Sequence, residues 1–129
     1  MKTSDLYTKP TFDGGKSMPI ILPSGETIKE TLKLIGSDSD IFAGEMARTR
    51  KLEIDLIGQK EKLSPLEYAK KEKSIKIELL SSLVIGWTFE EEFSPEAVRV
   101  LFLNAPYVME QVDSFSGTRS NFFVNPSTD

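Results

Sequence analysis

The sequence predicts an α+β fold, in which an N-terminal β-hairpin or small antiparallel sheet precedes a mainly α-helical part of about four helices. Apolar and polar residues alternate with a period of two over residues 27–35, as in a half-buried strand. After residue 37, four segments each begin with a Ser, Asp or Asn that can cap a helix. The 129 residues are enough for one domain, or for two small subdomains that share a core.

The predicted hairpin occupies residues 18–36. A short apolar run, Met18–Leu22, is followed by the turn Pro23-Ser24-Gly25-Glu26, in which Pro presets the first turn angle and Gly accepts a positive φ. On the second strand, one alternating set is apolar: Ile28, Leu32 and Leu34. Two strands alone are marginally stable in water. We therefore expect the hairpin to pack on a helix or to pair with strands of another copy.

A helical region is predicted over residues 37–124, packed with the hairpin as one domain. Its first helix is expected over about residues 40–57, with an apolar set made of Phe42, Met46, Leu52 and Leu56. The second begins at Ser64-Pro65-Leu66-Glu67, because Ser followed three residues later by Glu makes a capping box. We expect it to run to about residue 85 and to end at Gly86-Trp87.

Two shorter helices are predicted near the C-terminal end of this region. One begins at Ser94-Pro95, and the other opens at Asn104-Ala105-Pro106 with Asn104 as the cap. Their buried stripes are expected to contain Val98, Leu101 and Phe102 in the first, and Val108, Val112 and Phe115 in the second. Outside the helical region and the hairpin, residues 1–17 are predicted to be a flexible segment and residues 125–129 a polar tail.

The composition excludes several kinds of chemistry. The chain has neither cysteine nor histidine, so it lacks disulfides, thiolate metal sites and every Ser–His or Cys–His catalytic pair. The net charge of -4 opposes binding to a phosphate backbone, unless a local basic face exists. The longest apolar run, residues 79–87, is interrupted and too short to cross a bilayer. We therefore expect a cytoplasmic protein that binds neither nucleic acid nor membrane.

Three charged clusters have structural explanations that we prefer to chemical ones. Asp38 and Asp40 lack the spacing of a calcium loop and fit the capping of a helix. The consecutive residues Glu90–Glu92 are typical of a solvated loop, where a carboxylate lacks the burial that raises its pKa. Lysines at positions 70, 71, 73 and 76 alternate with glutamates, as on an exposed helix face. We thus predict no catalytic, cofactor-binding or metal-binding residues.

Most large aromatic residues, including Trp87, are expected in the core between the C-terminal helices. Phe122 and Phe123 differ, because they adjoin the polar tail and full burial there is less assured. An exposed aromatic pair is a typical anchor for a protein partner. We therefore interpret the pair Phe122-Phe123 as a candidate partner-binding element.

The C-terminal half carries a series of short motifs: Gly86-Trp87, the acidic linker Glu90–Glu92, Asn104-Ala105-Pro106, Gln111-Val112-Asp113-Ser114-Phe115 and Arg119-Ser120-Asn121-Phe122. This series resembles the phage tail assembly chaperones of long-tailed phages. Leu22-Pro23-Ser24-Gly25 and the residues from Gly36 to Asp40 are similar to the hairpin and helix start of related small tail-region proteins. The candidate partner-binding residues are Phe115, Arg119, Phe122 and Phe123.

The resemblance implies a small, non-catalytic protein without cofactors that acts in the host cell cytoplasm. Such chaperones coat the tape measure protein before the tail tube polymerises, and are then displaced and absent from the mature virion. A longer, frameshifted form recruits tube subunits in many of them. We also expect self-association, through strand pairing at the hairpin edge. Two alternatives remain open: a structural virion protein, such as a head–tail connector or minor tail component, and a small carboxylate- or metal-dependent enzyme.

Overall fold

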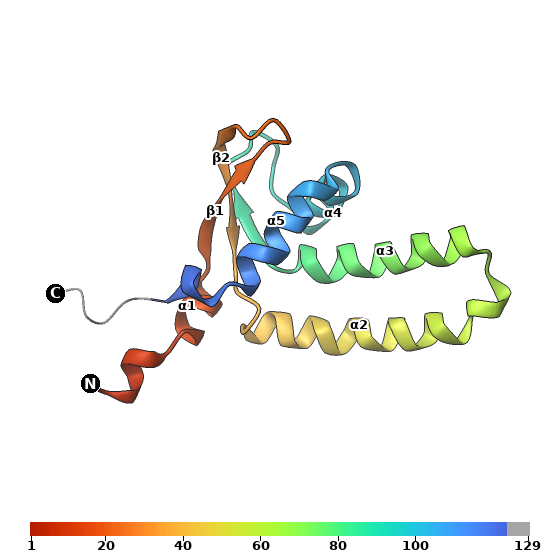
Figure 1. The fold of residues 1–129 in the computed structure, drawn as a ribbon, viewed down its shortest axis with the longest axis horizontal. Helices are drawn as coiled ribbons and strands as arrows, with labels where there is room; N and C mark the ends of the chain where they lie inside the picture. The colour runs from red at the N-terminus through yellow and green to blue at the C-terminus, as the bar shows by residue number, and fades with distance from the viewer. Residues whose placement is uncertain (124–129) are drawn as a thin grey trace.

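The computed structural model describes residues 1–123 and confirms the α+β fold (Figure 1). An antiparallel sheet has the order β1-β2-β3, formed by β1 (Lys16–Ile21), β2 (Thr27–Leu34) and β3 (Val84–Trp87). The α-helices of the described part are α1 (Lys9–Gly14), α2 (Asp40–Gly58), α3 (Pro65–Ser81), α4 (Pro95–Asn104) and α5 (Pro106–Gly117). Short 3-10 turns are η1 (Thr3–Leu6), η2 (Lys60–Lys62) and η3 (Arg119–Phe122).

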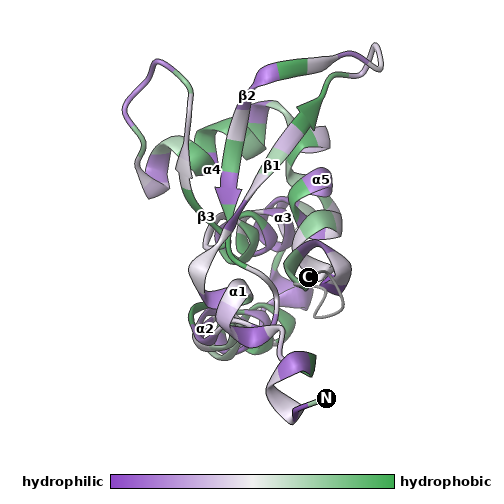
Figure 2. Ribbon diagram, turned by 90° about the vertical axis from the view of Figure 1, so that its left-hand side faces the viewer, coloured by the Kyte–Doolittle hydropathy of each residue, from purple (hydrophilic) through white to green (hydrophobic). Residues whose placement is uncertain are grey.

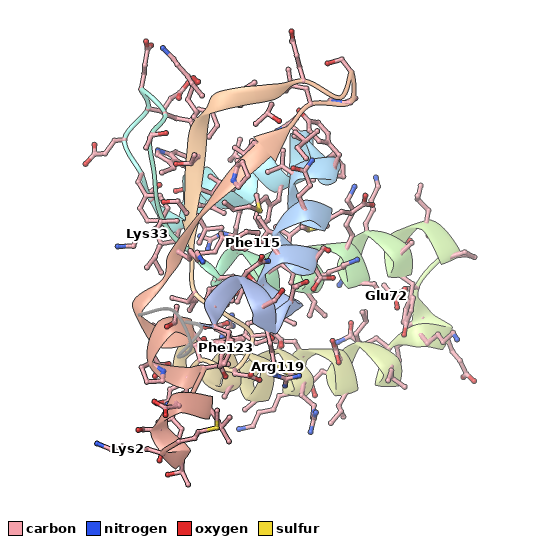
Figure 3. All side chains as sticks on the ribbon, turned by 60° about the vertical axis from the view of Figure 1, so that its left-hand side comes forward. Lys2, Lys33, Glu72, Phe115, Arg119 and Phe123 are labelled. Carbon is pink, nitrogen blue, oxygen red and sulfur yellow. The ribbon has the colours of Figure 1, made fainter. Side chains whose placement is uncertain are left out.

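The predicted hairpin is present as β1 and β2. Gly25 sits in the turn with a φ of 92°, a conformation that a residue without Cβ adopts freely. The period of two places Leu32 and Leu34 in the core, where both are fully buried. Lys33, between them, lies on the outer face of the sheet (Figure 3). The alternation in sequence therefore gave the correct buried face.

The third strand was not predicted. Residues up to about 85 were expected to extend the second long helix, but α3 ends at Ser81 and residues 84–87 pair antiparallel with β2. Thr88 continues the pairing, because its N–H donates to the Thr31 carbonyl at 3.1 Å and its hydroxyl oxygen accepts from the Thr31 N–H at 2.8 Å. The expectation was wrong because Val84 and Ile85 are β-branched residues that favour a strand when an edge is available for hydrogen bonding, as the edge of β2 is. Helical spacing along the sequence does not show that such an edge lies nearby.

The N-terminal segment is also more structured than expected. Residues 1–17 were predicted to be a flexible lead-in, yet residues 9–14 form α1, and Lys16 and Ser17 belong to β1. The reason is Phe12, which is fully buried and fixes α1 to the rest of the fold. The predicted polar tail, residues 125–129, lies outside the described residues.

We call α2, η2 and α3 together the arm, because Figure 1 shows α2 and α3 side by side and projecting beyond the other elements. Ser39 caps α2 by accepting the N–H of Phe42, at 3.3 Å. The predicted capping box at the start of α3 is present, since Ser64 and Glu67 exchange hydrogen bonds between side chain and backbone. Arg48 of α2 joins the two helices through Glu78 of α3, at 2.8 Å.

The apolar set predicted for α2 is only half buried. Phe42 and Leu56 belong to the buried residues, whereas Met46 is 42% exposed and Leu52 is 36% exposed. The difference arises because α3 is the main neighbour of α2 along the arm, and one helix covers only a narrow stripe of another. The arm therefore keeps apolar side chains at its surface.

The core lies where α3, α4 and α5 meet the sheet, and Figures 1 and 2 place α4 and α5 on the same face of the sheet. Val98, Phe102 and Val112 are fully buried there. The predicted cap of α5 is wrong: Ala105 holds the cap position, and the Asn104 side chain donates to the Val100 carbonyl at 2.9 Å. Within residues 1–123, no helix is long and apolar enough to cross a membrane.

Candidate partner-binding surface

The predicted anchor Phe122 is not a surface residue. It is fully buried, with its ring centroid 4.4 Å from that of Phe12 and 5.7 Å from that of Phe115. The prediction of an exposed pair is therefore wrong for Phe122, because the N-terminal segment folds back and supplies Phe12 as its cover. Phe123 remains 37% exposed, and Phe115 is half-buried.

We call α1 and η3, with the Gly36 backbone between them, the terminal clasp. The Gly36 N–H donates to the Phe12 carbonyl at 2.9 Å. A Cβ at Gly36 would lie 1.8 Å from a ring carbon of Phe12, so the ring packs directly on bare backbone. The packing of α1 in the clasp thus requires glycine at position 36, although Phe12 and Gly36 are far apart in the sequence.

Arg119 belongs to the same clasp. Its guanidinium donates to both carboxylate oxygens of Asp38, at 2.8 and 3.1 Å, and this pairing raises the pKa of Arg119. Figure 3 places Arg119 and Phe123 near the start of α2, far from Glu72 on the arm. Of the four predicted residues, Phe115 and Phe122 are in contact with each other and Arg119 is paired with Asp38, so these three hold α5 and η3 to the rest of the fold.

A second ion-paired cluster fixes α1 to α2. Lys9 donates to Asp13 and to Asp40, at 3.0 Å each, and Asp13 also accepts the backbone N–H of Asp40 at 3.2 Å. The Lys9 ammonium group is the main cause that holds the pKa of Asp13 below its ordinary value of 3.8. Asp40, interpreted from sequence as a capping residue, is instead held by α1, while Ser39 is the cap.

A largely apolar hollow lies beside α4, and we call it the aromatic slot. It has a volume of about 480 Å³ and is lined by Trp87, Phe89, Glu91, Ala97, Val100 and Leu101. Trp87 forms its wall, with edge-to-face contacts to Phe89 and Phe93 at 5.4 Å. Its indole N–H donates to the Glu91 carbonyl at 2.8 Å, which fixes the ring.

A groove of about 770 Å³ lies on the other side of Val100, between α3 and α4. It is lined by Lys70, Lys73, Ser74, Ile77, Glu78, Glu96, Arg99, Val100 and Leu103. Val100 is 55% exposed and Leu103 is 58% exposed. We call the slot and this groove together the α4 surface, because Val100 lines both.

A further groove of about 770 Å³ follows the arm toward the start of α5. Its apolar lining comes from Leu56, Ile57, Tyr68, Ile75, Leu79, Pro106 and Met109. Near it, the end of the arm exposes Ile54, Ile57 and Leu66, each more than 60% exposed. Apolar side chains at such positions are candidates for contact with another protein.

The sequence analysis missed Val100 and Leu103. A signal was present, because positions 98, 100, 101, 102 and 103 of α4 are all apolar. A helix that packs on one side needs fewer apolar positions than this, so the surplus predicts a second apolar contact. The residues Glu90–Glu92 are exposed on the connector before α4, as expected. Among the described residues, no three acidic side chains gather closely enough to hold a metal ion.

Comparison with known proteins adds one finding. A family model described as phage tail assembly chaperone matches residues 2–116, which include every strand and α1 to α4 together with nearly all of α5. No curated protein and no solved structure matches the chain.

Proposed function

The chain belongs to the family of phage tail assembly chaperones, and from this premise we propose that it binds the tape measure protein and keeps it soluble during tail assembly. The family match over residues 2–116 carries the proposal. The protein acts by contact and not by catalysis. It works in the host cell cytoplasm, is displaced when the tail tube forms, and is absent from the mature virion.

The exposed apolar residues support this role. A long helical client presents apolar stripes that aggregate unless they are covered. The arm offers Ile54, Ile57 and Leu66, and the α4 surface offers Val100 and Leu103, all more than half exposed. Several weak contacts of this kind give a high total affinity for the client, yet each contact can be released separately. Such contacts suit a protein that must leave its client.

The tail tube protein is the second proposed partner, and several chaperone copies act on one client.

Strand pairing at β1 is a poor route for self-association. The side-chain amide of Gln111 donates to the Ile21 carbonyl at 2.7 Å and accepts the Ile21 N–H at 3.0 Å, and Pro19 has no N–H. We therefore propose that copies lie next to one another on the client and not in a continuous sheet.

Coexpression tests the proposed function. The tape measure protein of the phage that encodes this chain is produced as overlapping fragments, each with and without the chaperone. We expect at least one fragment to move from the insoluble to the soluble fraction and to copurify with the chain. If fragments that cover the whole tape measure protein remain unaffected, the proposal is wrong.

Mass spectrometry of purified particles tests the second part of the proposal. A chaperone should be present in the infected-cell extract and missing from finished virions. A constant number of copies per particle, comparable to a known minor tail protein in the same spectrum, would favour a structural virion protein instead.

A further inference from the structure

The α4 surface combines an apolar floor with two kinds of charge. The acidic residues Glu90, Glu91 and Glu92 lie on the connector beside the aromatic slot, and Glu91 lines it. The basic residues Lys70, Lys73 and Arg99 line the groove on the other side of Val100. Within residues 1–123, none of these six side chains forms an ion pair. Their charges thus remain available to a partner.

The groove also contains two glutamates, which do not change this polarity. Glu78 is already paired with Arg48 of α2, at 2.8 Å. Glu96 lies in the first turn of α4, on the same helix end to which the acidic connector leads. The surface therefore runs from an acidic side at the connector to a basic side at α3, with apolar residues between.

We propose that the α4 surface binds an amphipathic helix of the tape measure protein, which rests on the function proposed above. One apolar side chain of that helix enters the aromatic slot and another enters the groove, on either side of Val100. Basic residues of the helix face the connector, and acidic residues face Lys70 and Lys73. Apolar anchors in adjacent hollows are the usual way in which a groove recognises one face of a helix, and opposite charges set its direction.

Substitution of Val100 tests the location of the site. Val100→Asp places a charge between the two hollows, on a side chain that is 55% exposed and so dispensable for folding. The fragment identified by coexpression is shortened to single helices that stay in solution as synthetic peptides, and these are titrated with the full chain by calorimetry. We expect Val100→Asp to weaken binding at least tenfold. Leu6→Asp is the matched control, because Leu6 is 61% exposed on η1, and it should bind as the unaltered chain does.

Trp87 provides a second measurement that needs no variant. It is the only tryptophan of the chain and forms a wall of the slot. A fragment free of tryptophan should shift the emission of Trp87 when an apolar side chain enters the slot. If circular dichroism shows that Val100→Asp does not fold, the emission of Trp87 in the unaltered chain tests the location of the site instead. Binding that leaves the emission unchanged would overturn the proposal.

Charge reversal tests the direction of the helix. Replacing Glu90, Glu91 and Glu92 together with Lys should weaken binding at low salt, and the difference should shrink as salt screens the charges. If both this variant and Val100→Asp bind as tightly as the unaltered chain, the site lies elsewhere while the chaperone function stands. If the unaltered chain binds no part of the tape measure protein, the function and the site are both wrong.

Discussion

At the residue scale, the contact between Phe12 and Gly36 links segments that the sequence separates. The ring occupies the space that a side chain at position 36 would need, and the Gly36 N–H is bonded to the Phe12 carbonyl. Gly36 is buried, so its backbone cannot exchange this bond for one to water. The packing of α1 therefore depends on the absence of a single methyl group.

Gly36→Ala should destabilise the protein. The added Cβ would meet Phe12 at 1.8 Å, and such overpacking costs about 1–3 kcal/mol or more. The measurement is the free energy of unfolding in urea. Gly44→Ala is the control, because Gly44 lies inside α2 with open space around it and alanine favours a helix by about 1 kcal/mol. Equal stability of the two variants would contradict the clasp geometry.

Phe122 and Phe123 should behave differently on substitution. Phe122→Ala removes a fully buried ring and should lower the free energy of unfolding by about 3–5 kcal/mol. Phe123→Ala affects a side chain that is 37% exposed and should change it by less than about 1 kcal/mol. Thermal unfolding of both variants distinguishes them. A large loss of stability for Phe123→Ala, with little loss for Phe122→Ala, would contradict the burial of Phe122 and the exposure of Phe123 described here.

At the scale of elements, α1 is attached to α2 by charge as well as by Phe12. Lys9 bridges Asp13 and Asp40, and Asp13 accepts the first backbone N–H of α2. Both carboxylates lie near the positive end of the α2 dipole, where negative charge is favoured. This attachment therefore requires Asp13 to be ionised.

The attachment should weaken in acid. The pKa of Asp13 is lowered in the folded state, so its ionised form favours folding above the ordinary value of 3.8. That contribution is lost as the pH falls through the lowered folded-state pKa. The stability difference between the unaltered chain and Asp13→Asn, measured by urea unfolding, should therefore be largest near neutral pH and shrink below about pH 4. A difference that stays constant down to about pH 2 would contradict a role for the Asp13 charge.

At the scale of the whole molecule, the structure separates a packed body from a projecting arm. The sheet, α4, α5 and the end of α3 share one hydrophobic cluster, whereas the far end of the arm has apolar residues such as Ile54 and Leu66 at its surface. Local stability follows the number of buried contacts. The two regions should therefore open with different free energies.

Hydrogen exchange should reveal this gradient. Backbone amides of residues 53–70 should exchange faster than those of β2 and of residues 108–112, because the arm end lacks a second layer of helices. Mass spectrometry after deuterium labelling measures both regions in one experiment. A bound tape measure fragment should slow exchange in residues 97–103 if the α4 surface is occupied. Uniform exchange over the free protein would contradict a separate arm.

The sequence by itself determined the elements whose signals are local. The hairpin follows from a turn with Gly25 and from the alternation of Leu32 and Leu34, and α3 starts at the capping box of Ser64 and Glu67. Motifs in residues 84–123 also pointed to the family whose model matches residues 2–116, because short patterns can be recognised in a sequence without knowledge of its fold.

Only the tertiary structure decided the features that join distant segments. Val84–Trp87 became a strand because the edge of β2 was free, and Phe122 was buried because Phe12 folds back from the other end of the chain. The same holds for the exposed Val100, whose place outside the core depends on how α4 packs. Burial is a property of neighbours in space, and periodicity along the chain records which residues are apolar but not what covers them.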